Sequence, residues 1–210
     1  MGYLKEMSDQ GYNVSSISNF HRVMLPNIFR SLGIYNNSKI VEIGAAHGHC
    51  AISLWEGGYQ NIRIVDIDTY NFDYFKSAYG FECFQCDVSK EAIPFSSESI
   101  RVVLNAHLIE HLSTPEYFLS ESFRIIEPGG IFILVTPDWR RQYKTFYRDP
   151  THLRPYDKES IARLLRLSGF TRIQISSWGS AYGFGRLQAY RIYQRFGFIG
   201  RDLIAIGFKE

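Results

Sequence analysis

Three histidines in the second half of the chain have the chemistry for proton transfer near neutral pH. His107 follows a predicted strand, His111 closes the segment "HLIEHL", and His152 lies in "YRDPTHLRPYDKES". An imidazole changes charge between about pH 5 and 8, so each ring could act as a general base. His152 and His111 are the catalytic candidates, with His152 preferred because its loop can fold over a bound substrate. Packing explains His111 equally well, and a hydrogen bond between Asp149 and His152 would close a polar turn without any catalytic role.

A small-residue loop offers a second kind of chemistry, the close approach of a ligand to the backbone. In "VEIGAAHGHC", residues 41–50, an apolar run stops at Gly44 and a second glycine follows at Gly48. Small residues at such a turn indicate that something must come near the main chain. The dinucleotide-binding pattern G-x-G-x-x-G would need glycine at positions 44, 46 and 49, but Ala46 and His49 stand there. The pattern is instead E-x-G-x-A-x-G, starting at Glu42.

Strands and helices alternate along the chain, which is typical of a parallel sheet with helices on both faces. Apolar runs predict strands at residues 38–45, 61–68, 81–88, 99–107, 131–138, 171–178 and 202–209. Helices are predicted at residues 48–58, 69–79, 113–130 and 157–170. Thr114 and Asp157 are the expected N-caps of the last two helices, and Pro128, Gly129 and Gly130 are expected to end the first of these two.

Ligands of such sheets bind beyond the carboxyl ends of the strands. The residues that follow the first four strands are Gly44, Ala45, Ala46, His47 and Gly48, then Asp66, Ile67 and Asp68, then Asp87 and Val88, and finally Asn105, Ala106 and His107. Asp66 lies 22 residues after Gly44. A carboxylate at the end of the second strand can accept two hydrogen bonds from a ribose diol.

Taken together, these residues resemble the class I S-adenosylmethionine-dependent methyltransferases. The loop is similar to the family's first motif, "CDVSKEAIPFSSESIRVVLNAHLIEHL" to its stretch from the third strand through the fourth, and "FRIIEPGGIFILVTPD" to its helix, Pro-Gly-Gly turn and fifth strand. The resemblance covers residues 39–170 and the final strand. Arg101 departs from it, because relatives often have Asp at this usually exposed position.

The resemblance implies S-adenosyl-L-methionine as cofactor and a Rossmann-like, doubly wound α/β sheet of seven mostly parallel strands with an antiparallel last strand. The cofactor's methionine and ribose portions would lie against the loop, with Glu42 near the amino group and Asp66 on the ribose. In the family, the residue matching Asp87 meets the adenine amino group and the next residue, Val88 here, donates a backbone N–H to the ring. The implied cofactor-binding set is Glu42, Gly44, Ala45, Ala46, Gly48, Asp66, Ile67, Asp87, Val88, Asn105, Ala106 and His107. No metal site is predicted.

Composition fits a single methyltransferase domain, residues 1–210, in a reducing, cytoplasmic setting. Hydrophobic residues make up 45% and charged residues 21%, and three cysteines imply no disulfide framework. The polar N-terminus does not resemble a secretory signal, and no apolar run approaches the ~20 residues of a membrane span. Cys83 and Cys86 form a C-x-x-C, but without a second pair they are interpreted as strand residues. The oligomeric state is not predicted.

Positive charge gathers in two segments of a chain whose net charge is only +2. Residues 139–155 hold five basic side chains against one acidic, and residues 177–202 hold four against one. We therefore expect acceptor-binding insertions at 139–156 and 177–202, after an N-terminal helical segment at 1–38. The second insertion also holds seven aromatic residues, which with arginine suit sugars, phosphates, nucleobases or peripheral membrane contact. A helix that packs its aromatics on the sheet explains it equally well.

The predicted function is transfer of a methyl group to an oxygen or nitrogen of a small-molecule or carbohydrate-type acceptor, expected to be anionic. A tRNA or protein methyltransferase is one alternative. Nucleic acid is disfavoured as a partner, because there is no separate RNA-binding module and "NAHL" stands where an Asn-Pro-Pro-Tyr-type motif would follow the fourth strand. A non-catalytic S-adenosylmethionine-binding protein is the other alternative.

Overall fold

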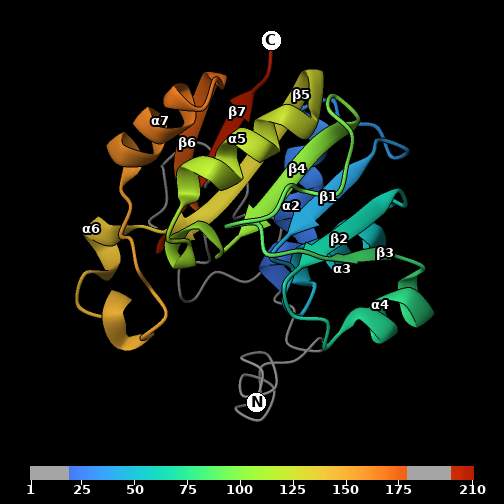
Figure 1. The fold of residues 1–210 in the computed structure, drawn as a ribbon, viewed down its shortest axis with the longest axis horizontal. Helices are drawn as coiled ribbons and strands as arrows, with labels where there is room; N and C mark the ends of the chain where they lie inside the picture. Colours follow the sequence, from blue (N-terminus) through green and yellow to red (C-terminus); the bar gives the residue numbers. More distant parts are fainter. Residues whose placement is uncertain (1–18, 179–199) are drawn as a thin grey trace.

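A seven-stranded sheet with helices on both faces forms the body of the protein in a computed structural model that describes residues 19–178 and 200–210 (Figure 1). The strands are β1 (Ile40–Ile43), β2 (Ile62–Asp66), β3 (Glu82–Gln85), β4 (Ile100–Ala106), β5 (Ile126–Pro137), β6 (Thr171–Trp178) and β7 (Asp202–Phe208). The helices are α2 (Asn19–Ser31), α3 (His49–Glu56), α4 (Phe72–Tyr79), α5 (Pro115–Ile125), α6 (Trp139–Gln142) and α7 (Lys158–Leu167), with 3-10 turns η2 (Ile109–His111) and η3 (Phe146–Arg148).

The strand order β3-β2-β1-β4-β5-β7-β6 confirms the predicted Rossmann-like architecture. The first five strands run parallel, and β7 lies antiparallel to both β5 and β6. The order reverses between β1 and β4, where Ile40 pairs with Val102. Such a switch point is where open α/β sheets bind their ligands. In Figure 1 the loops after the parallel strands gather at the lower side, opposite the C-terminus.

Two apolar cores cover the two faces of the sheet, because neighbouring strand residues point to opposite sides. Ile40 faces α2 and α3, while its neighbour Val41 faces the layer formed by α5 and α7. In the same way Leu104 packs into the first core and Val103 into the second. The central strands are therefore apolar on both faces, as in other buried parallel sheets.

Helix boundaries agree with the sequence signals at α7 and differ at α5. Asp157 and Ser160 form a reciprocal capping box at the start of α7. Thr114 precedes α5 as expected, but its hydroxyl donates to the carbonyl of Ser89 and does not cap the helix. The prediction that α5 continues to the Pro-Gly-Gly turn was wrong. The helix ends at Ile125, because the chain already pairs with β4 from Ile126 onward.

Two predicted segments fall partly outside the described residues. Of the N-terminal segment 1–38, the structure describes α2 from Asn19, and of the insertion 177–202 it leaves residues 179–199 undescribed. The division of the chain into these parts remains a prediction. Among the helices of the described residues, none is both long and apolar enough to cross a membrane.

Candidate active site

The loop after β1 turns sharply through left-handed backbone conformations. Gly44 has φ +71°, Ala46 φ +51° and Gly48 φ +72°. Only glycine adopts such angles without a cost in conformational energy. Glycine stands at two of the three positions, and Ala46 carries that cost at the third. The Gly44 N–H donates to the carbonyl of Val65 at 2.8 Å, and the Gly48 N–H donates to that of Ala45 at 2.7 Å. The loop is thus fastened both to β2 and to itself.

Asp66 fixes this loop from the end of β2. One carboxylate oxygen accepts the Ala46 N–H at 2.9 Å, and the other accepts the Asp68 N–H at 2.9 Å. Burial raises the pKa of Asp66, against the lowering effect of these two hydrogen bonds. Because each carboxylate oxygen has a second acceptor position, Asp66 can hold the loop and still accept from a ribose.

Asn71 is a loop-holding residue that the sequence pattern did not reveal. Its side-chain amide donates to the Ala46 carbonyl at 2.8 Å and lies 3.3 Å from Nδ1 of His47. It also precedes α4 at the N-cap position without making the usual side-chain cap. An Asn before a helix normally indicates a cap, so only the fold shows that its amide serves the loop.

Glu42 lies in β1 and is 2% exposed. Its carboxylate accepts the Ala51 N–H at 2.7 Å, in the first turn of α3. Burial raises the pKa of Glu42 to about 8, although the hydrogen bonds from Ala51 and Cys50 act to lower it. The side chain therefore holds α3 in place, and its predicted pairing with the cofactor's amino group stays a prediction.

Replacing Glu42 with glutamine should change how stability depends on pH. The folded state holds the proton up to about pH 8, whereas the unfolded side chain releases it near 4.5. Between these values the parent should lose stability as pH rises, by up to about 1.4 kcal/mol per pH unit. Glutamine keeps an acceptor for Ala51 and does not titrate, so its urea-unfolding free energies at pH 5.5 and pH 8 should differ less. Equal slopes in parent and variant would show that Glu42 is ionised throughout.

The carboxylate of Asp87, just after the third strand, already has hydrogen-bond and ion-pair partners nearby in the sequence. Asp87 accepts from the backbone N–H and hydroxyl of Ser89 and pairs with Lys90 at 3.0 Å. The Ser89 hydroxyl is the main reason that its pKa is lowered. The following Val88 is buried, and Ile67 after β2 is 59% exposed. An exposed apolar side chain at this edge of the sheet can pack against an aromatic ring. The contacts of Asp87 and Val88 with adenine stay predictions.

Two buried polar atoms near the switch point have no hydrogen-bond partner among the described residues. They are Nε2 of His47, in the loop, and Oδ1 of Asn105, at the end of β4. Buried polar atoms are normally paired, so these two can pair with a polar ligand or with a bound water. Nε2 of His47 and Oδ1 of Asn105, together with the left-handed loop and Asp66, fit a cofactor with amino, carboxylate and ribose groups.

His107 and Glu110 form an ion pair beyond β4. Nδ1 of His107 lies 3.3 Å from Glu110 Oε1, and its Nε2 lies 3.8 Å from Asp202. Desolvation would lower the pKa of His107, but these carboxylates raise it to about 9. The two carboxylates therefore favour the charged imidazolium form of His107. Its neighbour Ala106 is half-buried beside it.

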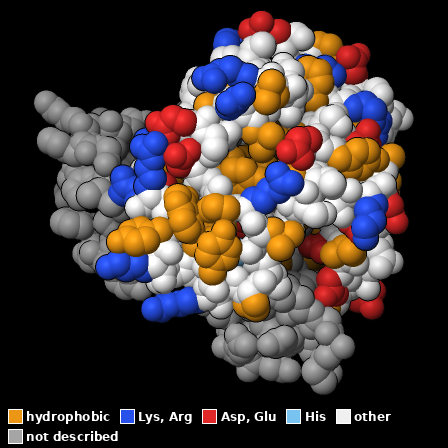
Figure 2. All heavy atoms as spheres, turned by 60° about the vertical axis from the view of Figure 1, so that its left-hand side comes forward, with side chains coloured by type: hydrophobic (Ala, Val, Ile, Leu, Met, Phe, Trp, Pro, Cys, Tyr) orange, Lys and Arg blue, Asp and Glu red, His pale blue; other side chains and the backbone are white. Residues whose placement is uncertain are grey.

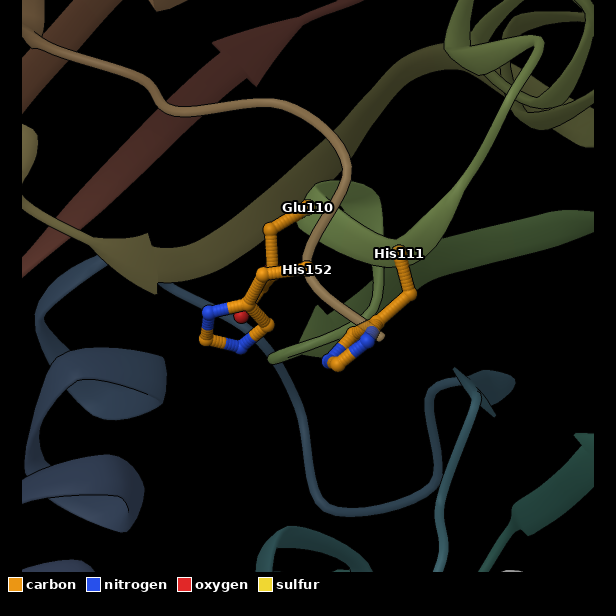
Figure 3. A group of neighbouring side chains, drawn as sticks. All are labelled: Glu110, His111 and His152. Atoms are coloured by element: carbon orange, nitrogen blue, oxygen red, sulfur yellow. The ribbon is translucent and has the colours of Figure 1, made fainter. Parts of the chain in front are cut away.

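The two catalytic candidates come together although 41 positions separate them in the sequence. The rings of His111 and His152 lie 4.7 Å apart, edge to face, with Glu110 next to them (Figure 3). A backbone hydrogen bond from the His152 N–H to the Asp149 carbonyl at 3.3 Å closes the predicted turn, while the Asp149 carboxylate is 3.9 Å from Nε2 of the His152 ring. Burial lowers the pKa of His111, which favours the neutral form of this ring.

Most of the positive charge of residues 139–155 is neutralised by partners outside that window. Arg140 pairs with Asp157 and Glu159 at 3.1 and 2.8 Å, and Arg154 pairs with Glu116 at 3.4 Å. Arg141 pairs with Asp138 at 3.2 Å. The net charge that we counted along the sequence therefore overstates the positive field of this segment.

Exposed hydrophobic side chains accompany these charges. Tyr143, Tyr147 and Leu153 are each more than half exposed. Figure 2 turns this side of the molecule forward and shows hydrophobic side chains grouped beside Lys and Arg. A surface of this kind can contact rings and anionic groups alike.

A family model described as a methyltransferase domain matches residues 18–175. The chain therefore belongs to this family, and its fold is that of a class I S-adenosylmethionine-dependent methyltransferase. A curated relative from Mycolicibacterium smegmatis, described as a probable S-adenosylmethionine-dependent methyltransferase, is 37% identical over 82 residues. The matched part covers 37% of this chain and 31% of that relative.

Solved structures share the fold over the whole chain. A methyltransferase from Archaeoglobus fulgidus has a TM-score of 0.68 and 19% identity, covering 99% of both chains. A protein from Thermotoga maritima, described as a possible histamine N-methyltransferase, has a TM-score of 0.71 and 17% identity, covering 100% of both. A methyltransferase from Haloferax volcanii, solved with the Trm112 activator, has a TM-score of 0.72 and 14% identity, covering 99% of this chain and 97% of that one. At these identities the likeness shows the fold alone.

Proposed function

We propose that this protein transfers the methyl group of S-adenosylmethionine to an oxygen or nitrogen of a small-molecule or carbohydrate-type acceptor. The observation that carries this proposal is the fastening of the left-handed loop to Asp66 at the switch point of the sheet. The cofactor supplies an electrophilic methyl group on a sulfonium. The acceptor's lone pair forms the new bond to carbon, the C–S bond breaks, and its electron pair stays on sulfur.

The residues of this chain would bind the two reactants and keep them aligned. Holding reactive atoms near ~3 Å in line can lower a barrier by about 7–11 kcal/mol. The cofactor would lie along the loop and Asp66, and the acceptor beyond β4, where His111 and His152 lie. The exposed Tyr143, Tyr147 and Leu153 support a small acceptor with an apolar or ring-shaped part.

The local ion pairs of Arg140, Arg141 and Arg154 weaken the case for a strongly anionic acceptor. Among the described basic residues of this segment, Arg148 and Lys144 make no ion pair, so an anionic group would meet these two. Whether the acceptor is neutral or anionic is tested by the salt dependence of its KM. Salt at 0.1–0.15 M screens the interaction of exposed charges over ~8–10 Å. Added salt should therefore raise the KM of an anionic acceptor and leave the KM of a neutral acceptor unchanged.

Replacing Asp66 with alanine should weaken binding of the product S-adenosylhomocysteine by about 1.5–3 kcal/mol, which is roughly 10- to 150-fold. The variant loses a charge-assisted acceptor for the ribose and the anchor of Ala46. Calorimetric titration of the product measures this directly. The matched control is Asp68→Ala, whose carboxylate caps the Tyr70 N–H and should change affinity little. If the control loses more affinity than Asp66→Ala, Asp68 is the ribose residue.

An acceptor screen with radiolabelled cofactor separates the remaining alternatives. Small hydroxyl- and amine-bearing molecules, charged and neutral, should accept the label, whereas tRNA and protein fractions should not. Product binding without turnover of any acceptor would favour the non-catalytic alternative. If S-adenosylhomocysteine does not bind, the proposed methyl transfer and both of its alternatives are rejected.

A further inference from the structure

Glu110, His111 and His152 place three potential metal ligands around one point. One side-chain donor atom from each residue lies within 4.8 Å of the other two. Glu110 and His111 come from η2, directly after β4, and His152 comes from the loop between η3 and α7. Figure 3 shows the two imidazole rings projecting to the same side of the short helix, with Glu110 beside them.

The hydrogen bonds of His152 leave its Nε2 lone pair available. Nδ1 lies 2.7 Å from the carbonyl oxygen of Phe146. A carbonyl only accepts, so Nδ1 must carry the proton and donate it. In the neutral ring the remaining lone pair is then on Nε2. The Phe146 ring also packs on this imidazole, with centroids 4.4 Å apart, and restricts its rotation.

His111 is fixed in the same tautomer by a different partner. Its Nδ1 lies 2.8 Å from the Thr151 hydroxyl and 3.3 Å from the Thr151 carbonyl. The single proton of that hydroxyl is donated to Asp149 at 2.6 Å, so the hydroxyl must accept from Nδ1. The Nε2 lone pair of His111 is therefore available too. An imidazole that binds a metal through one nitrogen normally donates the other N–H to a carbonyl, carboxylate or similar acceptor.

Glu110 supplies the anionic ligand and ties both histidine segments together. Its side chain is fully buried, and one carboxylate oxygen accepts the Thr136 hydroxyl at 3.0 Å. The other oxygen faces His107 at 3.3 Å. The Glu110 carbonyl accepts the backbone N–H groups of Leu153 and Arg154 at 2.8 and 3.1 Å, which docks the His152 loop on η2. Backbone hydrogen bonds therefore hold the three proposed ligands in place, in addition to the hydrogen bonds of their side chains.

We propose that Glu110, His111 and His152 bind one divalent first-row transition-metal ion. Two neutral imidazoles and a carboxylate suit Mn²⁺, Fe²⁺, Co²⁺ or Zn²⁺, whereas Mg²⁺ and Ca²⁺ prefer oxygen ligands. Donors at ~2.1 Å from such an ion are roughly 3.0–3.5 Å apart at tetrahedral or octahedral angles. The donor atoms, now up to 4.8 Å apart, need side-chain movements on the order of 1 Å to reach this spacing.

Three protein ligands leave coordination positions open, as in catalytic metal sites. If the proposed methyl transfer is right, an acceptor hydroxyl could occupy one of them, and its proton would pass to water as coordination lowers its pKa. This role rests on the proposed function, whereas metal binding itself does not.

Titration of the metal-free full-length protein with Co²⁺ tests the site without cofactor or acceptor. We expect one Co²⁺ per chain with visible d–d absorption, displaced by Zn²⁺ but not by equimolar Mg²⁺. His111→Ala and His152→Ala should each weaken Co²⁺ binding at least 10-fold. Each variant should still bind S-adenosylhomocysteine as the parent does, which shows that it is folded. His49→Ala, which removes a histidine outside the cluster, should keep the Co²⁺ affinity of the parent.

Two results would overturn the proposal. One is the absence of stoichiometric Co²⁺ binding by the parent, and the other is parental Co²⁺ affinity in either folded histidine variant. Failure of the methyl-transfer proposal looks different, because it would appear as absent product binding or turnover while Co²⁺ still binds. Loss of turnover on chelation, with product binding intact and recovery on adding Co²⁺ or Mn²⁺, would support the acceptor-binding role.

Discussion

Gly48→Ala should destabilise the fold by about 2–5 kcal/mol, from overpacking together with an unfavourable backbone angle. A Cβ on Gly48 would lie 2.6 and 2.7 Å from two ring carbons of Phe75, which is 1% exposed. The ring belongs to the first core, so it has to shift against closely packed neighbours. In a chain of this size each kcal/mol lowers Tm by about 2–4 °C, so thermal unfolding should show a fall of roughly 4–20 °C.

Gly80→Ala is the matched control for this substitution. Gly80 has nearly the same backbone angle, φ +71° against +72° for Gly48, but a Cβ there would meet no atom within 4 Å. Its loss of stability therefore measures the backbone strain alone, and the difference between the two variants measures the collision with Phe75. Phe75→Leu added to Gly48→Ala should recover part of that difference. Equal melting temperatures for the two glycine variants would show that the ring yields easily.

Gly44→Val should reduce the affinity for S-adenosylhomocysteine at least 100-fold, or about 2.7 kcal/mol. A β-branched side chain is strained at φ +71°, and here it would occupy the space over the loop that the cofactor is expected to use. The structure adds a second reason, because a Cβ on Gly44 would lie 2.9 Å from Cδ1 of Leu108. Calorimetric titration measures the affinity, and a melting curve confirms that the variant is folded.

The double variant Gly44→Val with Leu108→Ala separates these two causes. Removing the Leu108 side chain makes room for the new atoms and should recover stability, but it should not recover product binding if the cofactor lies against the loop. Parental affinity in either folded variant would contradict the placement of the loop against the cofactor.

Much of the architecture was predictable from short-range patterns. Apolar runs and capping residues such as Asp157 lie close together in the chain, and the α/β alternation restricts the sheet to few topologies. The set of residues at the carboxyl edge of the sheet, the rim, follows from the same reasoning, because the carboxyl ends of parallel strands meet there. The end of α5 was predicted wrongly because a long-range contact decides it. Pairing of Ile126 with β4 ends that helix before the local Pro-Gly-Gly signal would.

The charge of the 139–155 segment shows where counting along the sequence fails. The charge sum includes Arg140, but its partners Asp157 and Glu159 lie just beyond the window, at the N-cap and in the first turn of α7. Ion pairs form across space, so a charge sum over a stretch of sequence gives no surface potential until the fold is known.

The sequence by itself determined the family resemblance, the strand and helix order and the identity of the rim residues, because these depend on residue types and on spacings of a few positions. Only the tertiary structure decided that Phe75 lies over Gly48, that Asn71 holds the loop, and that His152 joins Glu110 and His111. Each of these contacts joins residues 24 to 42 positions apart. A contact at such separation depends on how the chain crosses the sheet, and no local preference of the residues concerned encodes that crossing.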